Sequence, residues 1–376
     1  MVSRRMVLGA GLGGLALVGA GGVWRVTRAP ETAYGPWDLA AASAPDDIRL
    51  DAFRHAILAP NPHNRQPWVI RLIGEDAAEI SCDLDKRLPV TDPFDRQITI
   101  GFGTFLEVAR IAALERGYAM ETELFPDGEA QPRLDESPVA RVTFAKVEGA
   151  ERDHLFSAIP QRRSNKEVYD LTKKVRDIQL ETITLDGGSF SADPAFVAQL
   201  RSQILKAIEI EMTTPGPYME SVDLMRIGHD QIDANPDGID LSGPMVEAGI
   251  VAGQIDRDQL ADMSSQAYAI GLEQTREAYG SVASLIWITT PGNSRADQIE
   301  AGRQYVRANL QATQLGLAMH PMSQSLQEYA EVAVAYRDVH KLLGAKEDER
   351  VQMLARVGYG KAIGPSPRWP LESHMI

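Results

Sequence analysis

Apolar residues recur along the chain at two spacings, and these spacings predict a mixture of helices and strands. Residues 46–58 and 97–116 place apolar side chains near every 3.6 positions, which predicts two amphipathic helices. Asp46 or Asp47 is placed to cap the first helix. Four segments show the partial alternation of strands: residues 68–73, 79–84, 120–125 and 139–144. The order of these elements predicts an α+β fold rather than a regular parallel array.

Sliding the chain against itself by 199 residues reveals an internal repeat. The offset aligns Arg96 with Arg295, Gly103 with Gly302, Gly117 with Gly316, and residues 118–120 with 317–319. The last glycine of each copy suits a left-handed helix C-cap. Two unrelated helices of similar role would give part of this match, but its reach beyond the C-cap favours duplication. We therefore expect two related halves, residues 46–148 and 149–376.

Residues 212–276 have no counterpart in the first half, which makes them a candidate lid. Helical periodicity at 246–252 and 259–269 flanks a turn-rich, acidic middle. Residues 233–238 have the opening spacing of a calcium loop, but Pro236 and the lack of a Glu at the twelfth position argue against calcium. No metal site is predicted.

The first 30 residues have the layout of an export signal or anchor. Arg4 and Arg5 precede a mildly apolar run, residues 7–24, in the manner of a twin-arginine signal. A rival reading is an FAD-binding Rossmann start at residues 9–14, although the strand before it and the acidic second strand are missing. We expect an exported protein, periplasmic or membrane-anchored and facing out, with cleaved and anchored forms both open.

The composition of the chain limits the size of its core and the classes of partner that it can bind. The chain has 376 residues, 44% of them hydrophobic, which is enough for one large core or two modest ones. A net charge of −14 argues against a nucleic-acid partner, so an anionic cofactor must be met by a local basic cluster. The single cysteine, Cys82, excludes an internal disulfide and suits a buried strand position.

Two short clusters have residue types suited to binding. One is a proline-stiffened loop with amides that suit a planar heterocycle: Pro60, Asn61, Pro62, His63, Asn64 and Gln66. The other gathers cations and a hydroxyl that suit a phosphate: Arg162, Arg163, Ser164 and Lys166. Taken singly, either cluster is also consistent with a stiff connection or a solvated run of charge.

Together these clusters resemble one family. Residues 162–166 resemble the Arg-Arg-Ser-x-Arg/Lys motif of nitroreductase-type FMN oxidoreductases, and residues 59–68 resemble their Pro-Ser-x-x-Asn-x-Gln-Pro-Trp motif. Residues 365–372 are similar to the family's closing Pro-x-Arg-Arg-Pro-Leu-Glu segment, and residues 316–324 to its turn beside the flavin ring. The resemblance covers residues 46–372 and is strongest to the single-chain, two-copy Acg-type branch.

This resemblance implies a nitroreductase-like fold in two copies, a monomeric pseudo-dimer that holds one FMN between its halves. The implied phosphate and ribityl contacts are Arg162, Ser164, Lys166 and Arg368, with Arg163 lining the isoalloxazine. The implied ring contacts from the other half are Pro60, Asn61, Pro62 and Asn64. Pro321, Met322 and Ser323 are implied to lie near the flavin N5. Asn61 stands where the family usually has Ser, and Trp369 replaces the second Arg of the closing motif.

The resemblance also implies an activity. FMN would take a hydride from NAD(P)H and pass two electrons to a small acceptor such as a nitroaromatic or a quinone. No side chain is demanded as a base, so His63 and His320 are expected to be hydrogen-bonding wall residues. The alternative is a non-catalytic FMN store or sensor, in which residues 212–276 form a closed lid over the flavin ring and exclude NAD(P)H.

Overall fold

The structure is a computed structural model that describes residues 29–30, 32–39 and 43–376. The expected export segment, residues 1–30, lies outside the described residues except for its last two. The rival FAD-binding motif at residues 9–14 lies outside them as well. Both readings therefore stay predictions.

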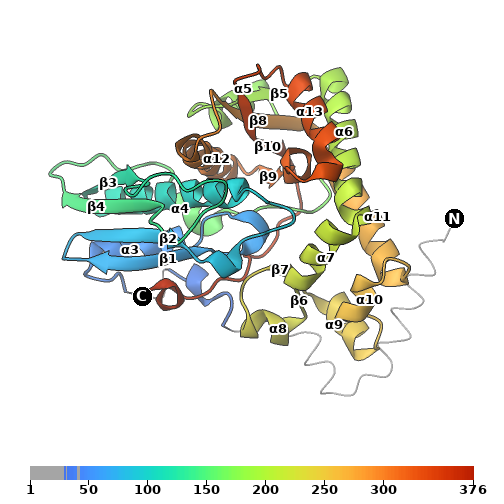
Figure 1. The fold of residues 1–376 in the computed structure, drawn as a ribbon, viewed down its shortest axis with the longest axis horizontal. Coiled ribbons are helices and arrows are strands. Elements are labelled where there is room, and N and C mark those ends of the chain that lie inside the picture. Colours follow the sequence, from blue (N-terminus) through green and yellow to red (C-terminus); the bar gives the residue numbers. More distant parts are fainter. Residues whose placement is uncertain (1–28, 31, 40–42) are drawn as a thin grey trace.

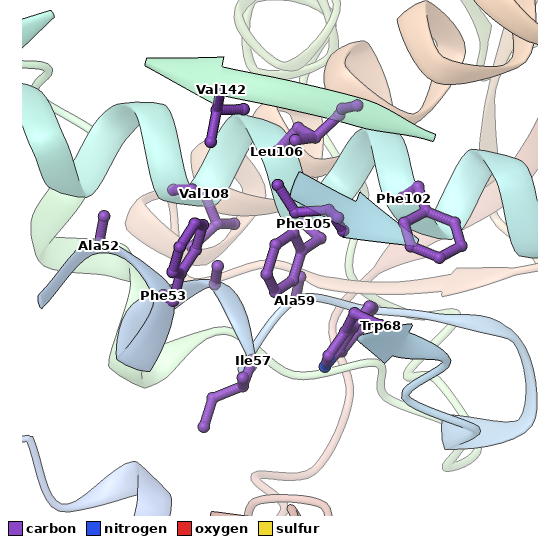
Figure 2. Close-up of a cluster of buried hydrophobic side chains, with 14 of the residues drawn as sticks. Ala52, Phe53, Ile57, Ala59, Trp68, Phe102, Phe105, Leu106, Val108 and Val142 are labelled. Carbon is purple, nitrogen blue, oxygen red and sulfur yellow. The ribbon is translucent and has the colours of Figure 1, made fainter. Parts of the chain in front are cut away.

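The first half is an antiparallel sheet packed with two helices (Figure 1). Its elements are α3 (Ile48–Ala56), β1 (Trp68–Ile73), β2 (Ala77–Cys82), α4 (Arg96–Glu115), β3 (Tyr118–Leu124) and β4 (Ala140–Lys146). Asp47 is the cap of α3, because its carboxylate accepts the backbone N–H of Arg49 at 2.9 Å. Figure 2 shows Phe53, Phe105 and Trp68 packed between the helices and the sheet. The Phe105 ring centroid lies 5.8 Å from that of Phe53 and 4.9 Å from that of Trp68.

The second half repeats this order. Its elements are α5 (Asp177–Ile183), β5 (Ser189–Ser191), β8 (Ser284–Thr290), α12 (Arg295–Gln314), β9 (Ala318–Pro321), α13 (Ala333–Leu342) and β10 (Arg350–Gly358). The sheets run β1-β2-β4-β3 and β5-β8-β10-β9, with every neighbouring pair antiparallel. In each half the long helix follows the second strand of this order. The two-copy α+β fold is therefore confirmed.

The two long helices, α4 and α12, pack against each other at a pair of glycines that the repeat aligns. A Cβ on Gly103 would lie 2.0 Å from the Ile299 carbonyl oxygen, and one on Gly302 would lie 2.1 Å from that of Ile100. Backbone contacts this close leave no room for any side chain. The repeat thus marks the contact surface between the halves.

Replacing Gly302 with alanine is expected to lower the free energy of unfolding by about 1–3 kcal/mol, because the new methyl group has no space at the helix crossing. The matched control is Gly271→Ala in α11 (Gln266–Gly280), where a Cβ would meet nothing within 4 Å. That change should raise stability by about 0.4–1 kcal/mol. Urea denaturation followed by circular dichroism measures both. Equal stability of the two variants would contradict the close helix packing.

The two arginines that the repeat aligns, Arg96 and Arg295, each donate hydrogen bonds to the opposite half. Arg96 donates to the carbonyls of Leu326 at 2.5 Å and Gln352 at 2.9 Å, both in the second half. Arg295 donates to the carbonyls of Phe94 at 2.9 Å and Pro132 at 3.0 Å, both in the first half. This exchange is the arrangement of an isologous dimer interface, contained here in one chain.

The insertion in the second half is longer than the predicted residues 212–276, because it forms the whole connection between β5 and β8. The first half joins the equivalent strands by residues 74–76 alone. The insertion contains α6 (Pro194–Thr213), α7 (Pro215–Leu224), β6 (Met225–Ile227), α8 (His229–Ala234), β7 (Ile239–Leu241), α9 (Pro244–Val251), α10 (Arg257–Ala261) and α11. The helical periodicity at 259–269 is divided between α10 and α11, because Ser265 caps α11 with its hydroxyl accepting the Tyr268 N–H at 3.0 Å.

The last residues return to the first half. After β10 the chain runs across the molecule to β1, where Ile376 N donates to Ile70 O at 3.0 Å. His374 Nδ1 lies 3.1 Å from the Trp68 carbonyl. This C-terminal arm, residues 359–376, carries Arg368 to the loop between α3 and β1.

The apolar helix α4 and the single cysteine, Cys82, both belong to the protein core. Among the described residues, α4 is the one helix long and apolar enough to cross a membrane, and it is mostly buried within the protein. Cys82 is buried at the end of β2, and burial raises the pKa of its thiol to about 12. It is the structural residue that its strand position predicts.

Candidate functional site

The loop between α3 and β1 has a constrained backbone. His63, Asn64 and Gln66 adopt φ angles of 46°, 54° and 51°, in the left-handed region that side-chain-bearing residues avoid. The conformation is held internally, because the Gln66 N–H donates to Asn61 Oδ1 at 2.7 Å. Each such residue costs about 1–3 kcal/mol, and residues of this kind cluster at active sites, ligand clamps and switch regions. The amide-rich loop is therefore a preorganised structure rather than a simple connection.

The first residues of this loop rest on α4. The Thr104 hydroxyl donates to the Pro60 carbonyl at 2.6 Å. A Cβ on Gly101 would lie 3.2 Å from Pro62 Cδ, so the proline ring fits directly over that glycine. Gly101 and Thr104 thereby fix the height of the loop above the helix.

The C-terminal arm meets the loop through Arg368, which is 2% exposed. Its Nη1 donates to Asn64 Oδ1, and Asn64 Nδ2 donates to the Pro367 carbonyl at 2.9 Å. Arg368 also donates to the carbonyls of Ile57 at 2.8 Å and Ala59 at 3.2 Å. The structure thus joins two sequence motifs that lie 300 residues apart.

The third motif reaches the same place. Arg162, 3% exposed, donates to the Leu58 carbonyl at 3.1 Å and to Asn309 Oδ1 on α12 at 3.1 Å. Its Nη1 lies 3.4 Å from Ser164 Oγ. Arg163 beside it is half-buried and donates to the Pro160 carbonyl at 2.9 Å, whereas Lys166 is exposed. Leu58 is therefore a shared acceptor for Arg162 and Arg368.

These three arginines, Arg162, Arg163 and Arg368, form an arginine cluster without a carboxylate partner among the described residues. Burial, with Arg163 nearby, lowers the pKa of Arg162 to about 10. Burial and the charge of Arg162 also lower the pKa of Arg368 well below its usual value, against which Asp240 acts. Like charges buried together favour an anion that would neutralise them. In a protein of net charge −14 this local excess of cations is unusual.

Buried donors without partners point the same way. Arg163 Nε, the Tyr305 hydroxyl and Trp369 Nε1 have no hydrogen-bond partner among the described atoms. Tyr305 is close enough to influence the pKa of Arg162, whereas the Trp369 ring centroid lies 5.8 Å from Lys86 Nζ. A buried donor without a protein partner can donate to an acceptor on a bound water or ligand. The cluster therefore fits a phosphate group by both charge and hydrogen-bonding capacity.

Trp37 also belongs to this site, although sequence reasoning missed it. It lies in η1 (Gly35–Trp37), in a stretch with no motif or periodicity. Its ring centroid is 4.5 Å from the Cζ of Arg163, 5.3 Å from that of Arg368 and 6.0 Å from that of Arg162. One indole thus stacks among all three guanidinium groups. Its contacts come from residues more than 120 positions away, so no local pattern could reveal it.

The turn after β9 is placed beside the arginine motif. Asn165 N donates to the Met319 carbonyl at 3.0 Å, which joins the motif to β9. Pro321 pairs with β10, and Ser323 opens η5 (Ser323–Leu326). Met322 is 1% exposed and its side chain packs in the core with Leu326, so its implied place near the flavin N5 stays a prediction. Its backbone N–H is also used, donating to the Leu354 carbonyl.

The two histidines of the site are held neutral. Burial and the nearby charge of Lys166 lower the pKa of His63 to about 4. Burial and Arg356 lower that of His320 well below its ordinary value. Neutral imidazoles can donate or accept hydrogen bonds at the wall of a site, but they add no charge to it at pH 7.

The insertion is fastened to the loop by Asp237, 1% exposed. Asp237 Oδ2 lies 3.0 Å from Arg65 Nη1 and 2.6 Å from Lys86 Nζ, and Oδ1 lies 2.6 Å from Arg226 Nη2. Gly238 N donates to the Asn64 carbonyl at 3.2 Å. The acidic segment whose spacing resembles the start of a calcium loop therefore contributes Asp237 to an ion-pair network within the protein. It holds the insertion against the predicted ring contacts.

No family model matches the chain. Two Mycobacterium tuberculosis H37Rv proteins are similar to it. "Putative NAD(P)H nitroreductase Rv3131" is 24% identical over 335 residues, 84% of this chain and 90% of the relative. "Putative NAD(P)H nitroreductase acg" is 30% identical over 113 residues, 30% of this chain and 32% of the relative. A Bacteroides fragilis nitroreductase solved with bound FMN aligns with a TM-score of 0.33 and 14% identity, covering 56% of this chain and 92% of its own. The sequence relatives confirm the predicted resemblance.

Proposed function

We propose, on the premise that the chain belongs to the nitroreductase-like family of these mycobacterial relatives, that it is an FMN-dependent NAD(P)H oxidoreductase. The arginine cluster carries this proposal, because the buried guanidinium groups of Arg162 and Arg368 form no ion pair with a carboxylate of the described residues and so fit the FMN phosphate. When bound, FMN supplies the two-electron chemistry by accepting a hydride from NAD(P)H for delivery to a small acceptor.

The protein's own residues would then bind FMN and orient its ring. Arg162 and Arg368 hold the phosphate end, with Ser164 and Lys166 beside them. The strained loop presents Asn61 and Asn64 from the other half, and Arg163 lines the ring. Because a single chain supplies every one of these groups, one molecule needs no second copy to complete the site. Neutral His63 and His320 form part of the wall and take no proton at pH 7.

Stopped-flow mixing with NADH or NADPH tests turnover. We expect the absorbance of the bound flavin near 450 nm to bleach faster with one of the two nucleotides than that of free FMN does under the same conditions. A rate no faster than that of free FMN would contradict the reductase proposal. An added nitroaromatic or quinone should then restore the absorbance.

One observation favours a second candidate, a flavin store or sensor. Asp237 and Gly238 hold the insertion directly on the loop at Arg65 and Asn64, so the ring would lie beneath a fixed cover. Such a protein would bind FMN tightly and show no accelerated bleaching. The stopped-flow rates therefore separate the two candidates.

We further propose that residues 1–30 direct export, as the paired arginines suggest. Fractionation of cells that produce the full chain checks this location, because a protein confined to the cytoplasmic fraction would contradict it. Retention of the segment in the exported protein would mark it as an anchor.

A further inference from the structure

A short segment before α3 covers the arginine cluster. This N-terminal strap, residues 32–38, is hydrogen-bonded to the insertion and to the C-terminal arm. Asp233 Oδ1 on the insertion accepts the backbone N–H groups of Thr32 and Ala33 and the Thr32 hydroxyl, each at 3.1 Å. On the C-terminal arm, Arg368 N donates to the Ala33 carbonyl at 2.8 Å, and Trp37 Nε1 donates to the Ser366 carbonyl at 2.7 Å.

Trp37 is the part of the strap that enters the site. Its side chain is 9% exposed and lies among Arg162, Arg163 and Arg368, while Thr32, Gly35 and Asp38 on the same strap are exposed. An aromatic face attracts cations but is a weaker partner than a dianion. The indole therefore occupies the surroundings that a phosphate would need.

The geometry points to the strap as a removable cover of the cofactor site, which must swing away before FMN enters and which slows both its entry and its release. This inference rests on the proposed FMN site. The strap suits the task because its residues Thr32, Gly35 and Asp38 face solvent, whereas Arg162 and Arg368 beneath it are fixed by backbone carbonyls of residues 57–59, directly after α3. The arginine cluster therefore stays formed when the strap leaves.

The test measures how fast FMN binds to flavin-free protein, using the quenching of FMN fluorescence in a stopped-flow instrument. We expect Trp37→Ala to speed association at least about tenfold and to speed release as well, and Trp37→Phe to fall between it and wild type. Asp233→Ala releases the strap without changing the indole, and it should also speed association. Tyr336→Ala is the matched control, because it removes a ring 5.9 Å from Arg350 in a remote part of the protein.

The outcomes separate the two claims. If wild type and Trp37→Ala both bind FMN at the same rate, or the variant binds more slowly, the strap is not a cover, and the FMN site still stands. If neither wild type nor any variant binds FMN, the proposed function fails and the cover fails with it. Acceleration in Trp37→Ala and Asp233→Ala, with Tyr336→Ala unchanged, supports the inference.

Discussion

Replacing Asp237 with alanine is expected to lower the free energy of unfolding by about 3–5 kcal/mol, the usual cost of breaking a buried ion pair on one side. The carboxylate is 1% exposed and neutralises Arg65, Lys86 and Arg226 together. Its loss would leave three cations close to one another in a region that water reaches poorly. Burial acts to raise the pKa of Asp237, but Lys86 and Arg226 outweigh it and hold the pKa below its usual value, so the group is ionised at pH 7.

A surface ion pair in the same insertion provides the matched control. Glu209 and Arg276 lie 2.6 Å apart with side chains 50% and 40% exposed, so Glu209→Ala should cost about 0–1 kcal/mol. Urea denaturation at pH 7 compares the two variants. An Asp237→Ala variant no less stable than Glu209→Ala would show that the insertion is not anchored by this network.

Charge reversal at Arg162 or Arg368 is expected to weaken FMN binding by at least about 1.5–3 kcal/mol, the scale of a charge-assisted hydrogen bond. That energy corresponds to a loss of about 10- to 150-fold in affinity. Both side chains are buried in the arginine cluster, so a glutamate at either position would place a carboxylate against the phosphate. Fluorescence titration with FMN gives the dissociation constants.

Two controls keep this result interpretable. Arg276→Glu makes the same change of charge on an exposed α11 residue, and it should leave the affinity unchanged. Arg368→Lys keeps the charge but loses the planar fork that reaches the carbonyls of Ile57 and Ala59, so it should bind FMN more weakly than wild type and better than Arg368→Glu. Urea unfolding curves identify any variant that binds FMN more weakly because it is partly unfolded. Wild-type affinity in a folded Arg368→Glu protein would contradict the phosphate site.

The sequence predicts the elements that carry strong local patterns. Trp68–Ile73 forms β1 with the expected bounds, and the helix expected at 97–116 is displaced by one residue in α4. The repeated glycines succeed for a physical reason: Gly103 and Gly302 meet at the helix crossing, so the packing of the two halves demands small residues at these positions. Gly117 and Gly316 likewise take left-handed φ angles of 77° and 67° at the helix ends.

What the sequence hides depends on contacts between distant segments. The start of the insertion is missed because β5 is only three residues long, too short for an alternating pattern to mark the strand before it. Asp237 looks like part of a calcium loop because two of its cation partners, Arg65 and Lys86, lie more than 150 residues away in the chain. Trp37 carries no motif, and only the folded chain brings it to Arg163. That the Met322 side chain packs in the core with Leu326 is likewise not visible in the sequence.

The most direct test of the FMN site is to purify the full chain, release its flavin by denaturation, and determine the mass and amount of that flavin per chain. We expect FMN at up to one molecule per chain, and saturation at one after FMN is added. FAD as the released flavin would favour the Rossmann reading of residues 9–14 instead. Two FMN molecules per chain would contradict the single site between unequal halves, and no flavin binding at all would contradict the assignment of the arginine cluster as a cofactor site.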